Sequence, residues 1–311
     1  MKIRNLLPII GMIIFIYIIL RIGISTLIDG LLLINPIYIL INLVLVFIAI
    51  IPPIYKWRII LKNQGVDISV INLLKIFLIS TFYGNITPGK IGTFVRVYYL
   101  KDVIKKPLGF CSSSILIDRI LDFLALLLFA MGGILLISSN YIWLFWLLAA
   151  GFVISFVSFI FLINQDKNKF ILKFIYRYFV PNRFKAMAKE NYLDFYENIP
   201  KLRTLLYPMF LTIISWMLYY SLPYVFIIAL GIKINYIYFV FLYALSTLIT
   251  LIPISIAGLG TREASLIILL GFYGVTASEV VITSLLSFVL FVVVTGVIGW
   301  YLSLKWKVQY G

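Results

Sequence analysis

Long apolar segments, most of them near the length that crosses a bilayer, recur along the whole chain. They fall at about 6–24, 37–55, 70–86, 108–137, 141–163, 206–230, 236–253, 263–274 and 280–303. A hydrocarbon core of roughly 30 Å needs about 20 apolar residues in a helix. Because the segments are continuous and do not alternate with polar residues, they predict helices and exclude the strands of a membrane barrel.

The balance of side chains supports the same class. Of 311 residues, 63% are hydrophobic and only 12% are charged. A water-soluble protein covers its apolar core with polar residues, and this chain has too few charges to do so. Lipid must therefore surround much of the chain. We predict an all-α, polytopic membrane protein whose single integral domain spans 1–311. The first apolar segment follows Lys2 and Arg4 without a small-residue cleavage site, which favours an uncleaved first span.

The formal net charge is +15, and the basic residues form short clusters beside the apolar segments. Loops rich in lysine and arginine stay in the cytoplasm, so this pattern predicts cytoplasmic termini in a multi-pass plasma-membrane protein. Attraction to anionic lipid head groups explains the charge better than nucleic acid does. The segment 165–205 is predicted to be a basic cytoplasmic stretch lying in the membrane interface.

Two segments carry loop signals that forbid a single crossing. Lys62 precedes the segment 70–98 and Lys101 follows it, so both of its ends should be cytoplasmic. The segment 236–275 should likewise start and finish outside. Both conflicts disappear if each segment enters the membrane and returns. The sequence therefore predicts about six full transmembrane helices plus two re-entrant hairpins.

Proline and glycine mark the expected tips of both hairpins. Proline removes a backbone donor and glycine relaxes φ, so helices break at such positions. Irregular backbone at membrane depth is tolerated only where protein or water satisfies its polar groups, which predicts an internal cavity between the tips. The hairpin-turn residues are Pro88, Gly89, Gly92, Pro253, Gly258 and Gly260.

The two hairpins also resemble each other in sequence. Ser80-Thr81 and Ser246-Thr247 precede the two breaks, and Arg96 and Arg262 follow them. Because the hairpins should enter from opposite sides, this similarity predicts an inverted repeat around a central site, as in many transporters. Chance convergence of glycine- and proline-rich loops is the alternative.

Charges inside apolar segments are costly, by roughly 2.5–3.5 kcal/mol each on insertion scales, so they usually face a cavity and have partners. Lys90 and Arg96 flank the first tip, where they would bind a phosphate or reach the head-group region by snorkelling. Asp118 and Asp122 share a helix face, and Arg119 reaches Asp122 one turn on. One negative charge then remains for a cation elsewhere. The candidates are Lys90, Arg96 and Arg262.

Arg262 and Glu263 come directly after the second tip. A helix should begin there, and its positive end together with Arg262 would suit an anionic head group. Glu263 is either part of the site or a first-turn acid that stabilises the helix dipole. Thr276-Ala277-Ser278-Glu279 before an apolar segment matches a capping box, so Glu279 is predicted to be structural.

Metal and cofactor chemistry find little support in the sequence. The chain has no histidine and one cysteine, Cys111, so zinc sites and thiol–imidazole catalysis lack ligands or partners. We predict no cofactor and no metal.

Three stretches resemble a known family. Thr87–Lys101 (TPGKIGTFVRVYYLK), Asp118–Leu126 (DRILDFLAL) and Ile252–Ala264 (IPISIAGLGTREA) are similar to the signature stretches of the lysylphosphatidylglycerol synthase transmembrane region. The resemblance implies flippase-like lipid handling. It does not imply the synthase activity, because no aminoacyl-transferase domain follows the last apolar segment. Asp118 stands where many members have Glu, and Lys90 stands where Arg is common.

The leading hypothesis is a transporter of an anionic phospholipid or a polyprenyl-phosphate-linked head group. In this hypothesis the substrate would be bound by Lys90, Arg96, Asp118, Arg119, Asp122, Arg262 and Glu263. One alternative is a membrane-embedded glycosyl or phosphate transferase. Another is a non-catalytic membrane subunit that docks a partner through 165–205, and a purely structural ion cluster remains open for the buried charges.

Overall fold

The computed structural model describes residues 7–87, 90–137, 142–163, 194–196, 199–252, 255 and 257–306. Within these residues every regular element is a helix and no strand is found. Two are short 3-10 helices, η2 and η5. The elements are α1 (Leu7–Ile22), α2 (Ile24–Leu32), α3 (Pro36–Asn63), α4 (Val70–Asn85), η2 (Ile91–Val95), α5 (Arg96–Ile104), α6 (Leu108–Ile137), α7 (Ile142–Ile163), η5 (Leu202–Leu205), α10 (Leu206–Ala229), α11 (Tyr236–Thr250), α12 (Thr261–Gly271) and α13 (Ala277–Lys305).

Five helical segments are long and apolar enough to cross a membrane. They are α3, α6, α7, η5 with α10, and α13. A sixth crossing results if α1 and α2 are counted together as one broken span. The two helices are bent by 77° relative to each other at Gly23, whose φ is +89°. The prediction of an all-α polytopic membrane protein is confirmed.

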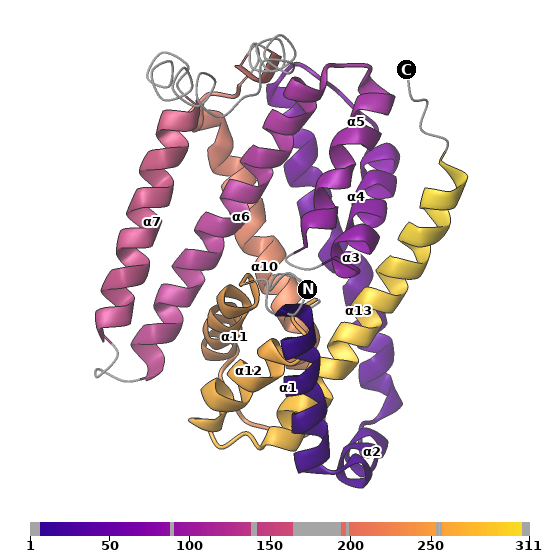
Figure 1. Ribbon diagram of the computed structural model, residues 1–311, viewed down its shortest axis with the longest axis vertical. Coiled ribbons are helices and arrows are strands. Elements are labelled where there is room, and N and C mark those ends of the chain that lie inside the picture. The colour runs from indigo at the N-terminus through magenta and orange to yellow at the C-terminus, as the bar shows by residue number, and fades with distance from the viewer. Residues whose placement is uncertain are drawn as a thin grey trace.

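The broken hairpins lie between these long helices. α4 and α5 occupy one half of the molecule in Figure 1, and α11 and α12 occupy the opposite half. α4, at 16 residues, and α11, at 15, are apolar but too short for a full crossing. Each ends near the middle of the molecule, where the chain breaks and turns back. The two hairpins therefore point toward each other from opposite ends.

The packing of the helices shows an internal symmetry. α3 and α10 pack against each other extensively, α4 packs along α13, and α11 packs along α6. α5 contacts α6 in the way that α12 contacts α13. Exchanging α3 with α10, α4 with α11, α5 with α12 and α6 with α13 converts the α4–α13 contact into the α11–α6 contact and the α5–α6 contact into the α12–α13 contact. The α3–α10 contact is converted into itself. This exchange is the packing pattern expected of an inverted repeat.

The residues follow the same exchange. One constant interval along the chain separates the members of every matched pair, as their residue numbers show. The pairs are Ser80 and Ser246, Gly92 and Gly258, Arg96 and Arg262, Asp118 and Ser284, and Gly133 and Gly299. A Cβ on Gly133 would collide with the Phe241 carbonyl of α11, and one on Gly299 would collide with the Leu78 carbonyl of α4. Glycine thus allows the same close helix contact in both halves.

The first tip is closed by local hydrogen bonds. The Thr87 hydroxyl accepts a bond from the Gly92 amide (2.8 Å) and donates to the Tyr83 carbonyl (2.8 Å). A side chain at Gly92 would collide with that same carbonyl, so this position requires glycine. The broken backbone is therefore satisfied by its own hairpin. Pro88, Gly89 and Pro253 lie outside the described residues, as does most of the segment 165–205.

Candidate functional site

A buried ion network joins three elements on one side of the molecule. Asp118 of α6 contacts Lys56 (Nζ–Oδ1, 2.7 Å), Arg96 (Nη2–Oδ2, 2.5 Å) and Arg119 (Nη2–Oδ2, 2.9 Å). Asp122 contacts Lys56 (2.6 Å) and Arg119 (3.3 Å). The side chains of Lys56, Arg96 and Asp118 are at most 2% exposed. Charges buried this completely require partners of opposite sign, and here they have them.

The sequence analysis named three cations that could pair with the remaining negative charge of the aspartates. Of these, Arg96 forms the ion pair with Asp118. Lys56 is a partner that sequence reasoning missed. The end of the apolar segment at 55 made Lys56 a loop residue, but α3 continues through it to Asn63. Trp57, Ile60 and Leu61 are almost fully buried and continue the helical spacing. That continued spacing is the signal that could have kept Lys56 inside the helix.

A central cavity lies between the two hairpin tips and has two lobes. The first lobe, about 180 Å³, is lined mainly by α3, α4, the first tip, α10 and α13. The second lobe, about 250 Å³, is lined mainly by α6, α10, α11 and the second tip. Both are bounded by the same central residues: Lys90, Arg119, Asp122, Trp216, Tyr219, Ala257 and Arg262. The two lobes therefore form one internal space.

The charge facing this space is net positive. Lys90, Arg119 and Arg262 line both lobes, and the acid that lines both is Asp122. Lys56 and Arg96 stand behind Asp118 and Asp122 in the ion network and add further positive potential. An anion entering the cavity would meet positive groups from the first tip, from α6 and from α12.

Arg262 and Glu263 form a second, self-contained ion pair. Arg262 Nη2 lies 2.7 Å from Glu263 Oε1, and the guanidinium stacks on Phe288 with 4.8 Å to the ring centroid. Glu263 also accepts hydrogen bonds from the Gly260 amide (2.7 Å) and the Ser284 hydroxyl (2.7 Å). Its side chain is fully buried and does not line the cavity. Glu263 therefore occupies the positive end of α12, and Arg262 alone of the two faces the cavity.

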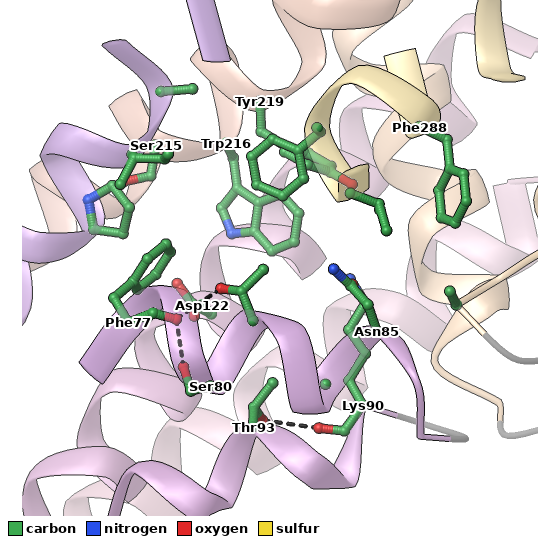
Figure 2. A pocket seen from close by; sticks show the side chains of 18 of the residues that line it. Phe77, Ser80, Asn85, Lys90, Thr93, Asp122, Ser215, Trp216, Tyr219 and Phe288 are labelled. Atoms are coloured by element: carbon green, nitrogen blue, oxygen red, sulfur yellow. Dashed lines mark hydrogen bonds between the residues drawn. The ribbon is translucent and has the colours of Figure 1, made fainter. Parts of the chain in front are cut away.

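Several buried donors at the cavity have no partner among the residues that the structure describes. They are Asn85 Nδ2, Arg119 Nε and Trp216 Nε1, and all three residues line the first lobe. Figure 2 shows Trp216 and Tyr219 facing Asp122 and Lys90 across this lobe, with Asn85 beside Lys90. Buried donors without acceptors are uncommon in native proteins, and each one calls for an explanation. Each of these atoms is enclosed by the protein, so an acceptor oxygen reaches it only if neighbouring side chains move.

The remaining predicted turn residues differ in their position. Gly258 lines the second lobe, with φ +81°. Gly92 and Gly260 shape the tips without lining either lobe. Throughout the part of the chain that the structure describes, no group of three or more acidic or cysteine side chains could hold a metal ion.

The fold and the site together define a polytopic α-helical membrane protein with two opposed broken hairpins around a positively charged internal cavity. The chain belongs to the lysylphosphatidylglycerol synthase transmembrane-region family, whose sequence pattern matches residues 8–299. The resemblance seen in the three signature stretches is thereby confirmed.

Two archaeal relatives extend over nearly the same length. A UPF0104 membrane protein of Methanocaldococcus jannaschii is 24% identical, covering 95% of this chain and 93% of its own. A UPF0104 membrane protein of Methanothermobacter thermautotrophicus is 25% identical, covering 91% of this chain and 90% of its own. Both are named as membrane proteins, in agreement with the fold.

Proposed function

We propose that this protein transports a lipid with an anionic head group across the membrane, and that the head group binds in the central cavity. The observation that carries the proposal is the set of charges around that space. Lys90, Arg119 and Arg262 face it from three different elements, against one acid, Asp122. A phosphate group would offset part of this positive excess and could accept charged hydrogen bonds from the lysine and the arginines.

The repeated hairpins supply a means of transport. Inverted repeats allow the two halves to exchange conformations, so that a central site faces one side of the membrane and then the other. The cavity lies where the two tips meet, and its two lobes belong to opposite hairpins. Motion of one hairpin against the other would then open one lobe while it closes the other.

The orientation follows from the basic residues of the connections. Lys62, Lys101 and Lys305 lie in the last turns of α3, α5 and α13, and Lys105 and Lys106 directly follow α5. In Figure 1, α5 and the end of α13 lie in the same half of the molecule. Lysine-rich ends stay in the cytoplasm, so the proposal places this end, with the end of α13, on the cytoplasmic side of a plasma membrane. α1 begins near mid-height in Figure 1, so a cytoplasmic N-terminus stays a prediction from the sequence. The first hairpin then enters from the cytoplasmic side.

The family assignment is consistent with a lipid substrate. We extend it to an anionic phospholipid or a polyprenyl-phosphate-linked carrier, because both present a phosphate at the end of a hydrocarbon body. The aspartates balance charge in the ion network and are not assigned a catalytic step. Docking of a partner through 165–205 is a separate hypothesis whose segment lies largely outside the described residues.

Lys90 provides the sharpest test, because it lines both lobes and takes no part in the ion network. Substituting Lys90→Gln should slow movement of fluorescent phosphatidylglycerol in proteoliposomes about tenfold, corresponding to about 1.4 kcal/mol. Lys90→Arg should keep most of the rate. The matched control is Lys233→Gln, an exposed lysine in the loop between α10 and α11 that lines neither lobe.

Two results would count against the proposal. One is wild-type protein that moves neither phosphatidylglycerol nor a polyprenyl phosphate. The other is equal transport by Lys90→Gln and Lys233→Gln, which would remove the cavity from the substrate path.

A further inference from the structure

An apolar groove opens on the membrane-facing side of the molecule beside the cavity, between the end of α4 and the middle of α13. We call it the α4–α13 groove. Its volume is about 400 Å³, and it is lined by Phe82, Asn85, Ile86, Val292, Val293, Gly296, Val297 and Trp300. Ile86, Val293, Val297 and Trp300 are each at least half exposed, as expected of side chains that face lipid.

The groove and the cavity meet at two residues. Asn85 and Val292 line both the groove and the first lobe. Asn85 is the polar member of the groove lining, and its buried Nδ2 donor has no partner within the described part of the chain. The positively charged interior and the apolar groove on the lipid side are therefore adjacent, with Asn85 and Val292 between them. A charged cavity next to an apolar groove suits an amphiphile, which has a charged head group and a hydrocarbon chain.

The open space beside Gly296 is not repeated at the matched position of the other half. A Cβ on Gly296 would meet nothing within 4 Å, so the space beside it is open. The matched position in the other half is Ala130, which is fully buried. The groove is therefore not a consequence of the repeat, because Gly296 of α13 borders open space whereas Ala130 of α6 is buried.

We propose that the α4–α13 groove holds the hydrocarbon chain of the lipid whose anionic head group occupies the cavity, with Asn85 at the level where head group and chain join. The lipid is taken from the proposed function. A hydrocarbon chain fits because the channel is apolar, reaches the bilayer and leads to a polar end. Diacyl phospholipids and polyprenyl phosphates share this chemistry.

The test uses the open space at Gly296. Gly296→Phe directs an aromatic ring into the groove, because its Cβ would meet no atom within 4 Å. Gly151→Phe is the matched control, since Gly151 is a helical glycine of α7 with equally open space and no part in the cavity. Each protein is reconstituted in phosphatidylcholine nanodiscs. Phosphatidylglycerol or a polyprenyl phosphate is added with a photoactivatable diazirine on its hydrocarbon chain, and labelled residues are mapped by mass spectrometry.

In the wild type, at least one of the two lipids should label Val293, Val297 and Trp300 about tenfold more than the exposed face of α7, which corresponds to about 1.4 kcal/mol of preference. Gly296→Phe should reduce this labelling to the level of α7, and Gly151→Phe should leave it unchanged. The lipid that labels the groove identifies the source of the chain. Equal labelling of α13 and α7 by both lipids would overturn the proposal.

Transport in proteoliposomes separates this inference from the proposed function. Wild-type transport that Gly296→Phe leaves unaltered would overturn the groove and leave the transporter standing. Groove labelling in a wild-type protein that moves no lipid would overturn the transporter and leave the groove as a lipid-binding site. Loss of transport in Gly296→Phe, with normal transport in Gly151→Phe, would support both.

Discussion

Arg96 and Asp118 form an ion pair in which Nη2 lies 2.5 Å from Oδ2, and each side chain is only 2% exposed. The pair joins the return helix of the first hairpin to α6, and Lys56 extends it to α3. Arg96 also stacks on Trp57, with 4.9 Å to the ring centroid. The first hairpin is thereby fixed to two long helices by charge as well as by packing.

Breaking this network should destabilise the protein strongly. Asp118→Asn leaves Lys56 and Arg96 buried with too little negative charge, and such loss typically costs about 3–5 kcal/mol. The measurement is the reaction of a thiol dye with Cys111 on heating, since Cys111 is the sole cysteine and is fully buried. Arg58→Gln is the control, because the Arg58–Asp67 pair is exposed and should contribute about 1 kcal/mol or less.

Two glycines three residues apart on α13 should respond in opposite ways. Gly299→Ala places a methyl group against the Leu78 carbonyl and should cost about 1–3 kcal/mol through forced separation of α4 and α13. Gly296→Ala enters open space and should be neutral or stabilise the helix by up to about 1 kcal/mol. Thermal unfolding in detergent compares them directly. Similar losses at both positions would contradict the close contact.

Removing the unpartnered donor of Trp216 should separate binding from stability. Trp216→Phe keeps an aromatic ring in the cavity but removes Nε1, which has no acceptor in the protein. The free protein should be equally stable or slightly more stable, whereas lipid transport should fall about tenfold through loss of one hydrogen bond. Unchanged transport would show that Nε1 does not contact the head group.

The capping box at the start of α13 should matter only for folding. Thr276 Oγ1 accepts from the Glu279 amide (3.4 Å), and Glu279 Oε2 accepts from the Thr276 amide (2.8 Å). Thr276→Ala should cost about 1 kcal/mol of stability and leave the rate of lipid movement per folded molecule unchanged. A specific loss of transport would assign this helix end to the substrate path.

Much of the architecture was predictable because membrane rules are strict. Apolar length and loop charge gave the spans and the hairpins, and the Ser-Thr and arginine pairs indicated the repeat. The capping role of Glu279 followed from a local motif and is confirmed. Lys56 was missed because a lysine at the edge of an apolar segment has the same pattern whether its helix stops or continues.

The cavity lining was less predictable, because it depends on which helix faces meet. Asn85 and Trp216 lie in segments where polar and aromatic residues suit many positions, so only their arrangement in space marks them. Glu263 shows the converse. Sequence alone placed it beside a helix start, and both readings, site member and first-turn acid, remained open until its hydrogen bonds to Gly260 and Ser284 were seen.

The two arginines at matched positions are neutralised in different ways. Arg96 depends on an acid from a neighbouring helix, whereas Arg262 carries its acid as the adjacent residue, Glu263. If the first hairpin moved along α6, Arg96 would lose Asp118 as its counter-ion, and the membrane interior would solvate the unpaired charge poorly. The second hairpin brings its counter-ion along when it shifts. The first hairpin is thus held to its neighbouring helix by charge, whereas the second is held to α13 through the neutral side chains of Ser284 and Phe288.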